Sequence, residues 1–151
     1  MGSSLVKIDV HIIFHVKTNS PRIIETDLKR LFQYIGGIIK RLDAIPIAVG
    51  GRPDHIHILT TLPKNLTLTD LVCSIKTNSS KWLKGQGPLY SNFGWQDGYG
   101  AFSISPSISQ KTTDYILHQF EHHHNRTFEE EFKLFLDQYG IEYNERYLFT
   151  D

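Results

Sequence analysis

The sequence predicts an α+β fold of the ferredoxin-like, split βαβ type: a four-stranded antiparallel sheet with helices on one face, plus a tyrosine-bearing helix and a C-terminal helix. Three observations support this prediction. Hydrophobic and polar residues alternate over residues 5–17, which is typical of a half-buried strand. Two segments, 22–43 and 67–85, place apolar residues at helical spacing. Segments with strand character follow each of them, so the predicted order is β-α-β-β-α-β.

The remaining elements follow from turn, capping and periodicity signals. In order, they are a strand over 44–49, a tight turn over 50–53, a strand over 55–62, a helix opened by Thr67 and ended by Gly85, a strand over 98–105, a helix from Ser107 or Ser109 to about His123, and a helix opened by Thr127 and ended by Gly140.

The two faces of the predicted sheet have different roles. The first and second helices cover one face, and the other is left open for chemistry or for more helix. His11 and His15 lie on the polar side of the first strand and are expected to be ordinary surface groups. A close approach of the first helix to the sheet would explain the pair Gly36-Gly37 within that helix.

The composition is that of one ordinary globular domain over residues 1–151, with residues 1–4 disordered or left from expression and residues 125–151 forming a C-terminal helix and tail. No apolar run approaches the ~20 residues of a membrane helix. The single cysteine, Cys73, is expected to be a buried thiol in a reducing cytoplasm.

Charge is distributed unevenly although the net charge is zero. Residues 1–100 carry 12 Lys and Arg against 7 Asp and Glu, giving +5, whereas residues 101–151 carry 4 against 9, giving −5. This asymmetry permits a basic face on the first hundred residues. The overall field does not by itself indicate a nucleic-acid binder.

Chemistry is concentrated at His55-Ile56-His57. Side chains at i and i+2 of a strand leave the same face, so the two imidazoles stand side by side. Such a pair could hold one metal ion. Two solvated histidines on a half-exposed strand are the alternative interpretation.

A second group lies on the third predicted helix. Tyr115 and Gln119 are four residues apart and therefore share one helix face. One interpretation is a nucleophile and a metal ligand on the same rigid element. The other is that Tyr115 belongs to the core and Gln119 to the surface.

Taken together, these residues resemble the single-tyrosine HUH transposases, the TnpA-like enzymes of insertion sequences and of chromosomal repeats (REP). The His-hydrophobic-His motif would be His55-Ile56-His57, preceded by Asp54, and residues 114–119 resemble the tyrosine helix of that family. The strand 98–105 is also similar. The resemblance spans roughly residues 5–147.

The resemblance implies a metal-dependent reaction on single-stranded DNA with hairpins. His55, His57 and Gln119 would hold Mg²⁺ or Mn²⁺, which polarises the scissile phosphate. Tyr115 would attack it, leaving a 5′-phosphotyrosine and a free 3′-OH that allows rejoining. The resemblance also implies a homodimer, since family members commonly donate the tyrosine helix to the partner subunit.

Basic and aromatic residues are candidates for DNA contacts. They are Arg52, Lys76, Lys81, Trp82 and Lys84. The alternatives are a solvated helix face for the lysines and a core position for Trp82.

Two other functions compete with the transposase. The acidic C-terminal helix departs from mobile relatives that end soon after the tyrosine helix, which favours a domesticated hairpin-DNA-binding protein with weak or no cleavage activity. An unrelated metal-dependent hydrolase that uses His55 and His57 without Tyr115 is the third hypothesis.

Overall fold

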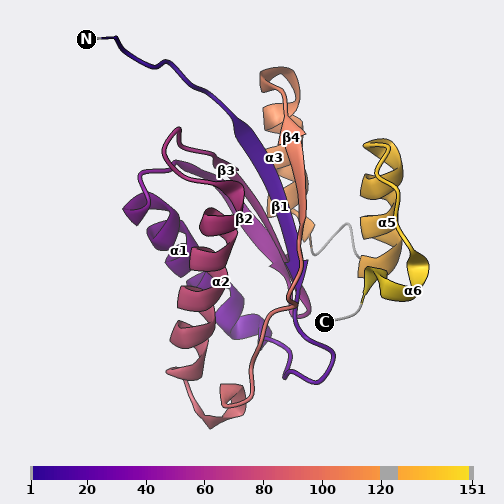
Figure 1. Cartoon of the computed structure of the whole chain (residues 1–151). Coiled ribbons are helices and arrows are strands. Elements are labelled where there is room, and N and C mark those ends of the chain that lie inside the picture. Colours follow the sequence, from indigo (N-terminus) through magenta and orange to yellow (C-terminus); the bar gives the residue numbers. More distant parts are fainter. Residues whose placement is uncertain (1, 120–125, 150–151) are drawn as a thin grey trace.

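The computed structural model describes residues 2–119 and 126–149 and confirms the predicted α+β class (Figure 1). Its four-stranded sheet has the order β2-β3-β1-β4, and all neighbouring strands are antiparallel. No described helix is long and apolar enough to cross a bilayer. The elements are β1 (Asp9–His15), α1 (Glu25–Arg41), β2 (Pro46–Arg52), β3 (His55–Thr61), α2 (Leu68–Lys84), β4 (Gly100–Ile104), α3 (Ser109–Leu117), α5 (Phe128–Gln138) and α6 (Glu145–Leu148).

The predicted start of β1 and the predicted turn between β2 and β3 are wrong. β1 begins at Asp9, because its partners β3 and β4 end opposite that residue, at Thr61 and Ile104. The glycines and Arg52 of the predicted turn belong to β2 instead. Since Arg52 pairs with His55, only two residues, 53 and 54, connect the hairpin. The predicted part of the third helix beyond residue 119 lies outside the described residues.

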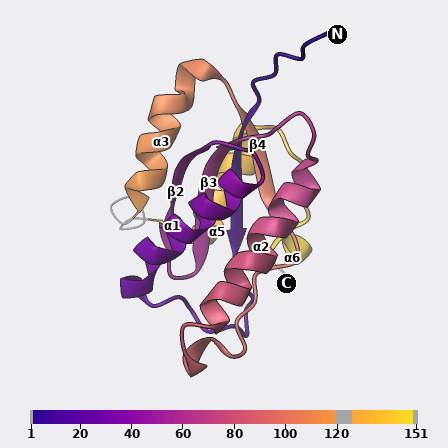
Figure 2. The same ribbon diagram turned by 90° about the vertical axis from the view of Figure 1, so that its left-hand side faces the viewer.

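Helices α1 and α2 cover one face of the sheet (Figure 2). Ile12 and Ile58 point into this layer and are fully buried. A Cβ atom added at Gly36 or Gly37 would meet no heavy atom within 4 Å, so the expected close approach of α1 to the sheet is wrong. Cys73 is exposed on the outer side of α2, which also corrects the expectation of a buried thiol.

The second face of the sheet is covered by further helices, one of the two outcomes expected for it. Helix α3 packs over β2 and β3, where Ile116 contacts Leu59. Helix α5 packs its aromatic side over Ile13 of β1 and Phe102 of β4. His11 lies beneath these helices at 1% exposure, so its prediction as a surface group is wrong. The second face of β1 carries Asp9, His11, Ile13 and His15, of which the first three are buried and His15 is half-buried, so the alternation of β1 does not mark a solvated face.

Two glycines let α3 and α5 approach the sheet. A Cβ atom at Gly50 would lie 2.1 Å from the carbonyl oxygen of Ile116 in α3. A Cβ atom at Gly100 would lie 2.5 Å from the ring of Phe132 in α5. Both positions therefore depend on the absence of a side chain, one beneath each helix.

We expect Gly50→Ala and Gly100→Ala each to lower the free energy of unfolding by about 1–3 kcal/mol, because the added methyl group must displace a backbone or a packed ring. Gly36→Ala is the matched control. That position is open and helical, so the free energy of unfolding should rise by roughly 0.5–1 kcal/mol. Urea denaturation followed by circular dichroism measures all three, and an unchanged midpoint for Gly50→Ala would contradict the close packing of α3.

Candidate active site

The two imidazoles of β3 converge on one point beneath α3 and α5. The side chains of His55 and His57 are 1% and 0% exposed, and their ring centroids lie 5.1 Å apart. Both direct their Nε2 atoms toward Glu131 of α5, at 3.6 Å from Oε1 for His55 and 2.8 Å for His57. The strand period of two places both rings on the same face, and the structure buries that face, which the sequence did not predict.

Tyr115 lies at the same site. Its hydroxyl group donates a hydrogen bond to Oε2 of Glu131, so one carboxylate contacts both His57 and the tyrosine. The ring of Tyr115 stands edge-on to that of His57, with centroids 5.8 Å apart. Burial and the negative charge of Glu131 raise the pKa of the Tyr115 phenol above its ordinary value. The hydroxyl group is therefore protonated at neutral pH.

Gln119 joins the site from just beyond α3, which ends at Leu117 with His118 as its C-cap, so the predicted helix through Gln119 is interrupted at that point. Its side chain is 2% exposed, and its Oε1 lies 3.2 Å from Nε2 of His55. Its amide nitrogen donates to the backbone carbonyl of Tyr115 at 3.3 Å, which fixes the direction of the amide oxygen. Although α3 ends before Gln119, this hydrogen bond holds Gln119 beside Tyr115, and both side chains face the histidines.

Two further residues support the imidazoles from behind. Oδ1 of Asp54 lies 2.7 Å from Nδ1 of His55. Although burial acts to raise the pKa of Asp54, its hydrogen bond and charge interaction with His55 hold that pKa below the usual value. Nε2 of His11 lies 2.8 Å from Nδ1 of His57. Burial, reinforced by the charge of His57, lowers the pKa of His11 well below its ordinary value despite the opposing charge of Glu131.

The buried group His55, His57 and Glu131 could hold a metal ion, since one donor atom from each lies within 4.8 Å of the others. Gln119 adds an amide oxygen on the side of His55. Two imidazole nitrogens with carboxylate and amide oxygens form a mixed donor set that suits divalent cations. Metal-bound histidines commonly make a hydrogen bond through their other ring nitrogen, and Asp54 and His11 make such contacts with His55 and His57.

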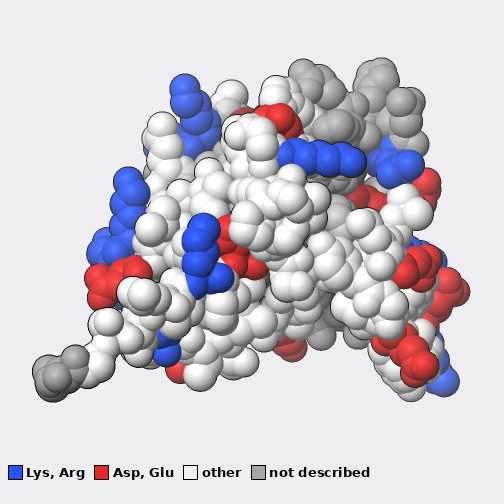
Figure 3. Space-filling view, turned by 90° about the horizontal axis from the view of Figure 1, so that it is seen from above, with Lys and Arg blue, Asp and Glu red and all other residues white. Residues whose placement is uncertain are grey.

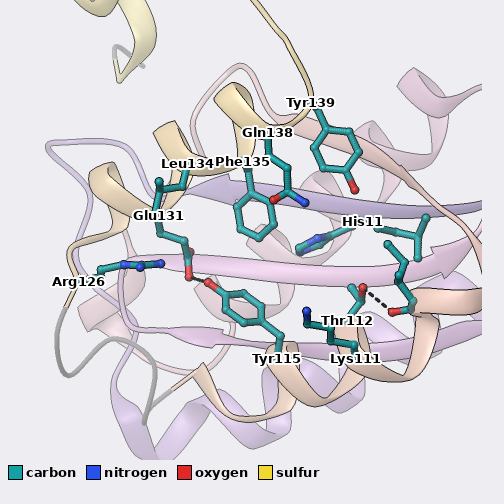
Figure 4. A pocket seen from close by; sticks show the side chains of 12 residues that line it. His11, Lys111, Thr112, Tyr115, Arg126, Glu131, Leu134, Phe135, Gln138 and Tyr139 are labelled. Carbon is teal, nitrogen blue, oxygen red and sulfur yellow. Dashed lines mark hydrogen bonds between the residues drawn. The ribbon is translucent and has the colours of Figure 1, made fainter.

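A cavity of about 300 Å³ reaches the site between α3 and α5. Figure 4 shows Tyr115 and Glu131 pointing toward each other at one end of it. Lys111 and Arg126 line the cavity together with the ring of Phe135. An anionic group could approach the Tyr115 hydroxyl through this cavity, past two cationic side chains.

The predicted DNA-binding residues of α2 lie far from this site, because α2 covers the opposite face of the sheet (Figure 1). Lys81 and Lys84 are exposed there. The Trp82 ring is partly buried and stacks on Tyr34, with centroids 5.0 Å apart. The structure therefore does not bring these side chains together with Tyr115.

Lys76 and Arg52 make intramolecular contacts. Nζ of Lys76 donates to the backbone carbonyls of Gln96, Asp97 and Gly98 at 2.7, 3.2 and 2.6 Å, and burial lowers its pKa to about 8. Arg52 forms an ion pair with Glu25 at 3.1 Å. On the face seen in Figure 3, Lys and Arg side chains are scattered, and acidic side chains gather on the side of the C-terminal helices.

Sequence reasoning missed Glu131 as a site residue and assigned it to the helix N-terminus. A signal was nevertheless present. Apart from the exposed Leu134, the apolar positions of α5 are 128, 132, 135 and 136, and position 131 completes the i, i+3, i+4, i+7, i+8 stripe. An acid in that stripe must be buried, and a buried carboxylate requires polar partners.

Comparisons with known proteins agree with the geometry. A family profile described as "Transposase IS200 like" matches residues 4–119. No curated protein sequence matches the chain significantly. Among solved structures, a candidate transposase from Deinococcus radiodurans R1 is 17% identical with a TM-score of 0.61, covering 77% of this chain and 93% of its own. A REP-associated tyrosine transposase bound to a REP hairpin is 16% identical with a TM-score of 0.54, covering 77% and 68% respectively.

We expect His57→Ala to weaken Mn²⁺ binding by more than about 100-fold, because loss of a supporting residue alone typically weakens metal binding 10–100-fold. His118→Ala is the matched control, since that histidine is exposed and its ring nitrogen Nδ1 contacts the backbone carbonyl of Asp114, away from the imidazole pair. Calorimetry and the electron paramagnetic resonance spectrum of Mn²⁺ provide the measurement. Equal affinity in both variants would exclude the metal site at β3.

Proposed function

The chain belongs to the family of IS200-like transposases, and we propose that it cleaves and rejoins single-stranded DNA at hairpin-flanked sites through a 5′-phosphotyrosine intermediate on Tyr115. The observation that carries this proposal is the shared carboxylate. The Tyr115 hydroxyl group and Nε2 of His57 contact the two oxygens of Glu131, so the nucleophile lies against the imidazole pair.

The residues of the site divide the work between them. His55, His57, Gln119 and Glu131 would hold a divalent cation, Mg²⁺ or Mn²⁺. When bound, this ion supplies Lewis-acid polarisation of the scissile phosphate. Tyr115 Oη attacks the phosphorus, the bond from phosphorus to the 3′-oxygen breaks, and a phosphotyrosine forms. A second 3′-OH reverses the step and joins new ends, so no nucleotide cofactor is needed.

The proposed substrate is single-stranded DNA that folds into hairpins. Support comes from the REP-associated transposase, which is similar to this chain in fold and was solved with a REP hairpin. Lys111 and Arg126, beside Tyr115, would neutralise the strand that enters the cavity. Contacts from Arg52, Lys76, Lys81, Trp82 and Lys84 to the hairpin stay a prediction, and we expect Lys81 and Lys84 to contribute most because their side chains are exposed.

The working unit is proposed to be a homodimer of one-domain subunits spanning residues 1–151, acting in the cytoplasm where cellular DNA lies. Within one chain, Tyr115 and Gln119 already contact their own histidines. Exchange of the tyrosine helix, expected from the resemblance, would replace these contacts by equivalent ones between subunits.

One observation favours a second candidate function, that of a hairpin-binding protein with weak or no cleavage. Helix α5 encloses the site so completely that His57 and Glu131 are 0% and 3% exposed. A DNA strand must reach Tyr115 through the cavity between α3 and α5. If the strand cannot enter this cavity, the protein would bind hairpins without forming a covalent adduct.

We expect Tyr115→Phe to abolish the covalent protein–DNA adduct while leaving hairpin affinity unchanged, because only the attacking oxygen is lost. Tyr139→Phe is the matched control on the wall of the same cavity. A denaturing gel with labelled hairpins from the flanks of the gene, in Mn²⁺ or Mg²⁺, measures the adduct. Wild-type protein that binds hairpins without any adduct would favour the second function, and an adduct that survives in Tyr115→Phe would exclude Tyr115 as nucleophile.

A further inference from the structure

Glu131 occupies a position that packing alone does not explain. Its neighbours on the inward face of α5 are Phe128, Phe132 and the partly buried Phe135, yet it is an acid and only 3% exposed. Burying an ionised carboxylate strongly destabilises the fold unless hydrogen bonds and opposite charges compensate for it. An apolar residue would fill the same face at no such cost. The acid therefore calls for an explanation in its contacts.

The two oxygens of the Glu131 carboxylate make different contacts. Oε1 faces the imidazoles, 2.8 Å from Nε2 of His57, and Oε2 accepts the hydrogen of the Tyr115 hydroxyl group. One oxygen can thus face a cation while the other receives a proton. Glu131 also lies outside residues 4–119, the region that the family profile matches. Its contact to Tyr115 is therefore supplied by a helix that the profile does not include.

We propose that Glu131 is a catalytic residue that accepts the proton of Tyr115 during strand cleavage, an inference that rests on the proposed function above. As Tyr115 Oη bonds to phosphorus, its hydrogen passes to Oε2 of Glu131. The bond from phosphorus to the 3′-oxygen breaks with its electron pair, and the 3′-oxygen takes a proton from water. In rejoining, the incoming 3′-OH loses its proton to water, and Glu131 returns a proton to the departing Tyr115 oxygen.

The geometry meets the requirement for a general base, which must lie within hydrogen-bond reach of the proton that it removes. The Tyr115 hydroxyl group donates to Oε2 of Glu131, and the second contact of that carboxylate, to His57, fixes its orientation. The cavity past Lys111 and Arg126 gives a phosphate access to the same oxygen. The hydroxyl oxygen of Tyr115 is therefore in contact with the proposed base and accessible to a phosphate through the cavity.

The test compares Glu131→Gln with Glu129→Gln, which removes the same charge from the first turn of the same helix at an exposed position. Single-turnover adduct formation is measured at saturating Mn²⁺, with Mn²⁺ affinity determined separately for each variant. We expect Glu131→Gln to slow the adduct by at least about 100-fold, the lower end of the range for general acid–base catalysis. Glu129→Gln should react at the wild-type rate.

Two further measurements separate a base from a merely structural group. Replacing Tyr115 by 3,5-difluorotyrosine, whose phenol loses its proton more readily, should restore much of the rate of Glu131→Gln. In protein labelled with [¹³Cζ]tyrosine, the Tyr115 resonance, assigned as the one missing from Tyr115→Phe, should move in Glu131→Gln and stay in place in Glu129→Gln. This second readout reports the hydrogen bond without any DNA.

Each contrary outcome has a distinct meaning. A wild-type adduct with an unchanged rate in Glu131→Gln overturns the base, and a faster rate shows instead that the carboxylate holds the site closed. A defect that the fluorinated tyrosine does not relieve reduces Glu131 to a structural role. If wild-type protein binds hairpins and forms no adduct, the proposed function fails and the base fails with it, whatever the position of the resonance.

Discussion

The arrangement of the second face of the sheet depends on the contacts of the buried Glu131 carboxylate. It is held by His57 from β3 and by Tyr115 from α3, and it is presented by α5. An ion in this apolar layer is tolerated only while its partners stay in place, because a lost partner leaves an uncompensated charge. The two helices and the sheet are therefore coupled through a polar contact surrounded by aromatic rings.

This coupling exists because two helices share one face of a small sheet. Helix α3 lies close to β2 over Gly50, and α5 lies close to β4 over Gly100. Between them, the central strands β1 and β3 present His11, His55 and His57. The chemistry is thus located along the line where the two covering helices meet, and the cavity beside Tyr115 opens from the same line.

Local periodicity accounts for what the sequence could predict. The strand period placed His55 beside His57, and the helical period placed Tyr115 beside Gln119, because these relations span only two to four residues. Glu131 lies 74 residues from His57, and no local pattern links the two. Lys81 was assigned to DNA binding from its charge alone, whereas the fold places it on the face opposite Tyr115. Helices α3 and α5 cover the second face and bury His11 through contacts between residues far apart in the sequence, so local patterns could not predict this burial.

The contact between His11 and His57 has a consequence for the hydrogens of both rings. A neutral imidazole carries one N–H, so when Nε2 of His57 donates to Glu131, its Nδ1 must accept from His11. A cation at Nε2 requires the other tautomer, in which Nδ1 of His57 donates to His11 and the His11 hydrogen moves to its own far nitrogen. A cation bound at Nε2 of His57 would therefore change the tautomers of both His57 in β3 and His11 in β1, although His11 does not contact the site of the ion.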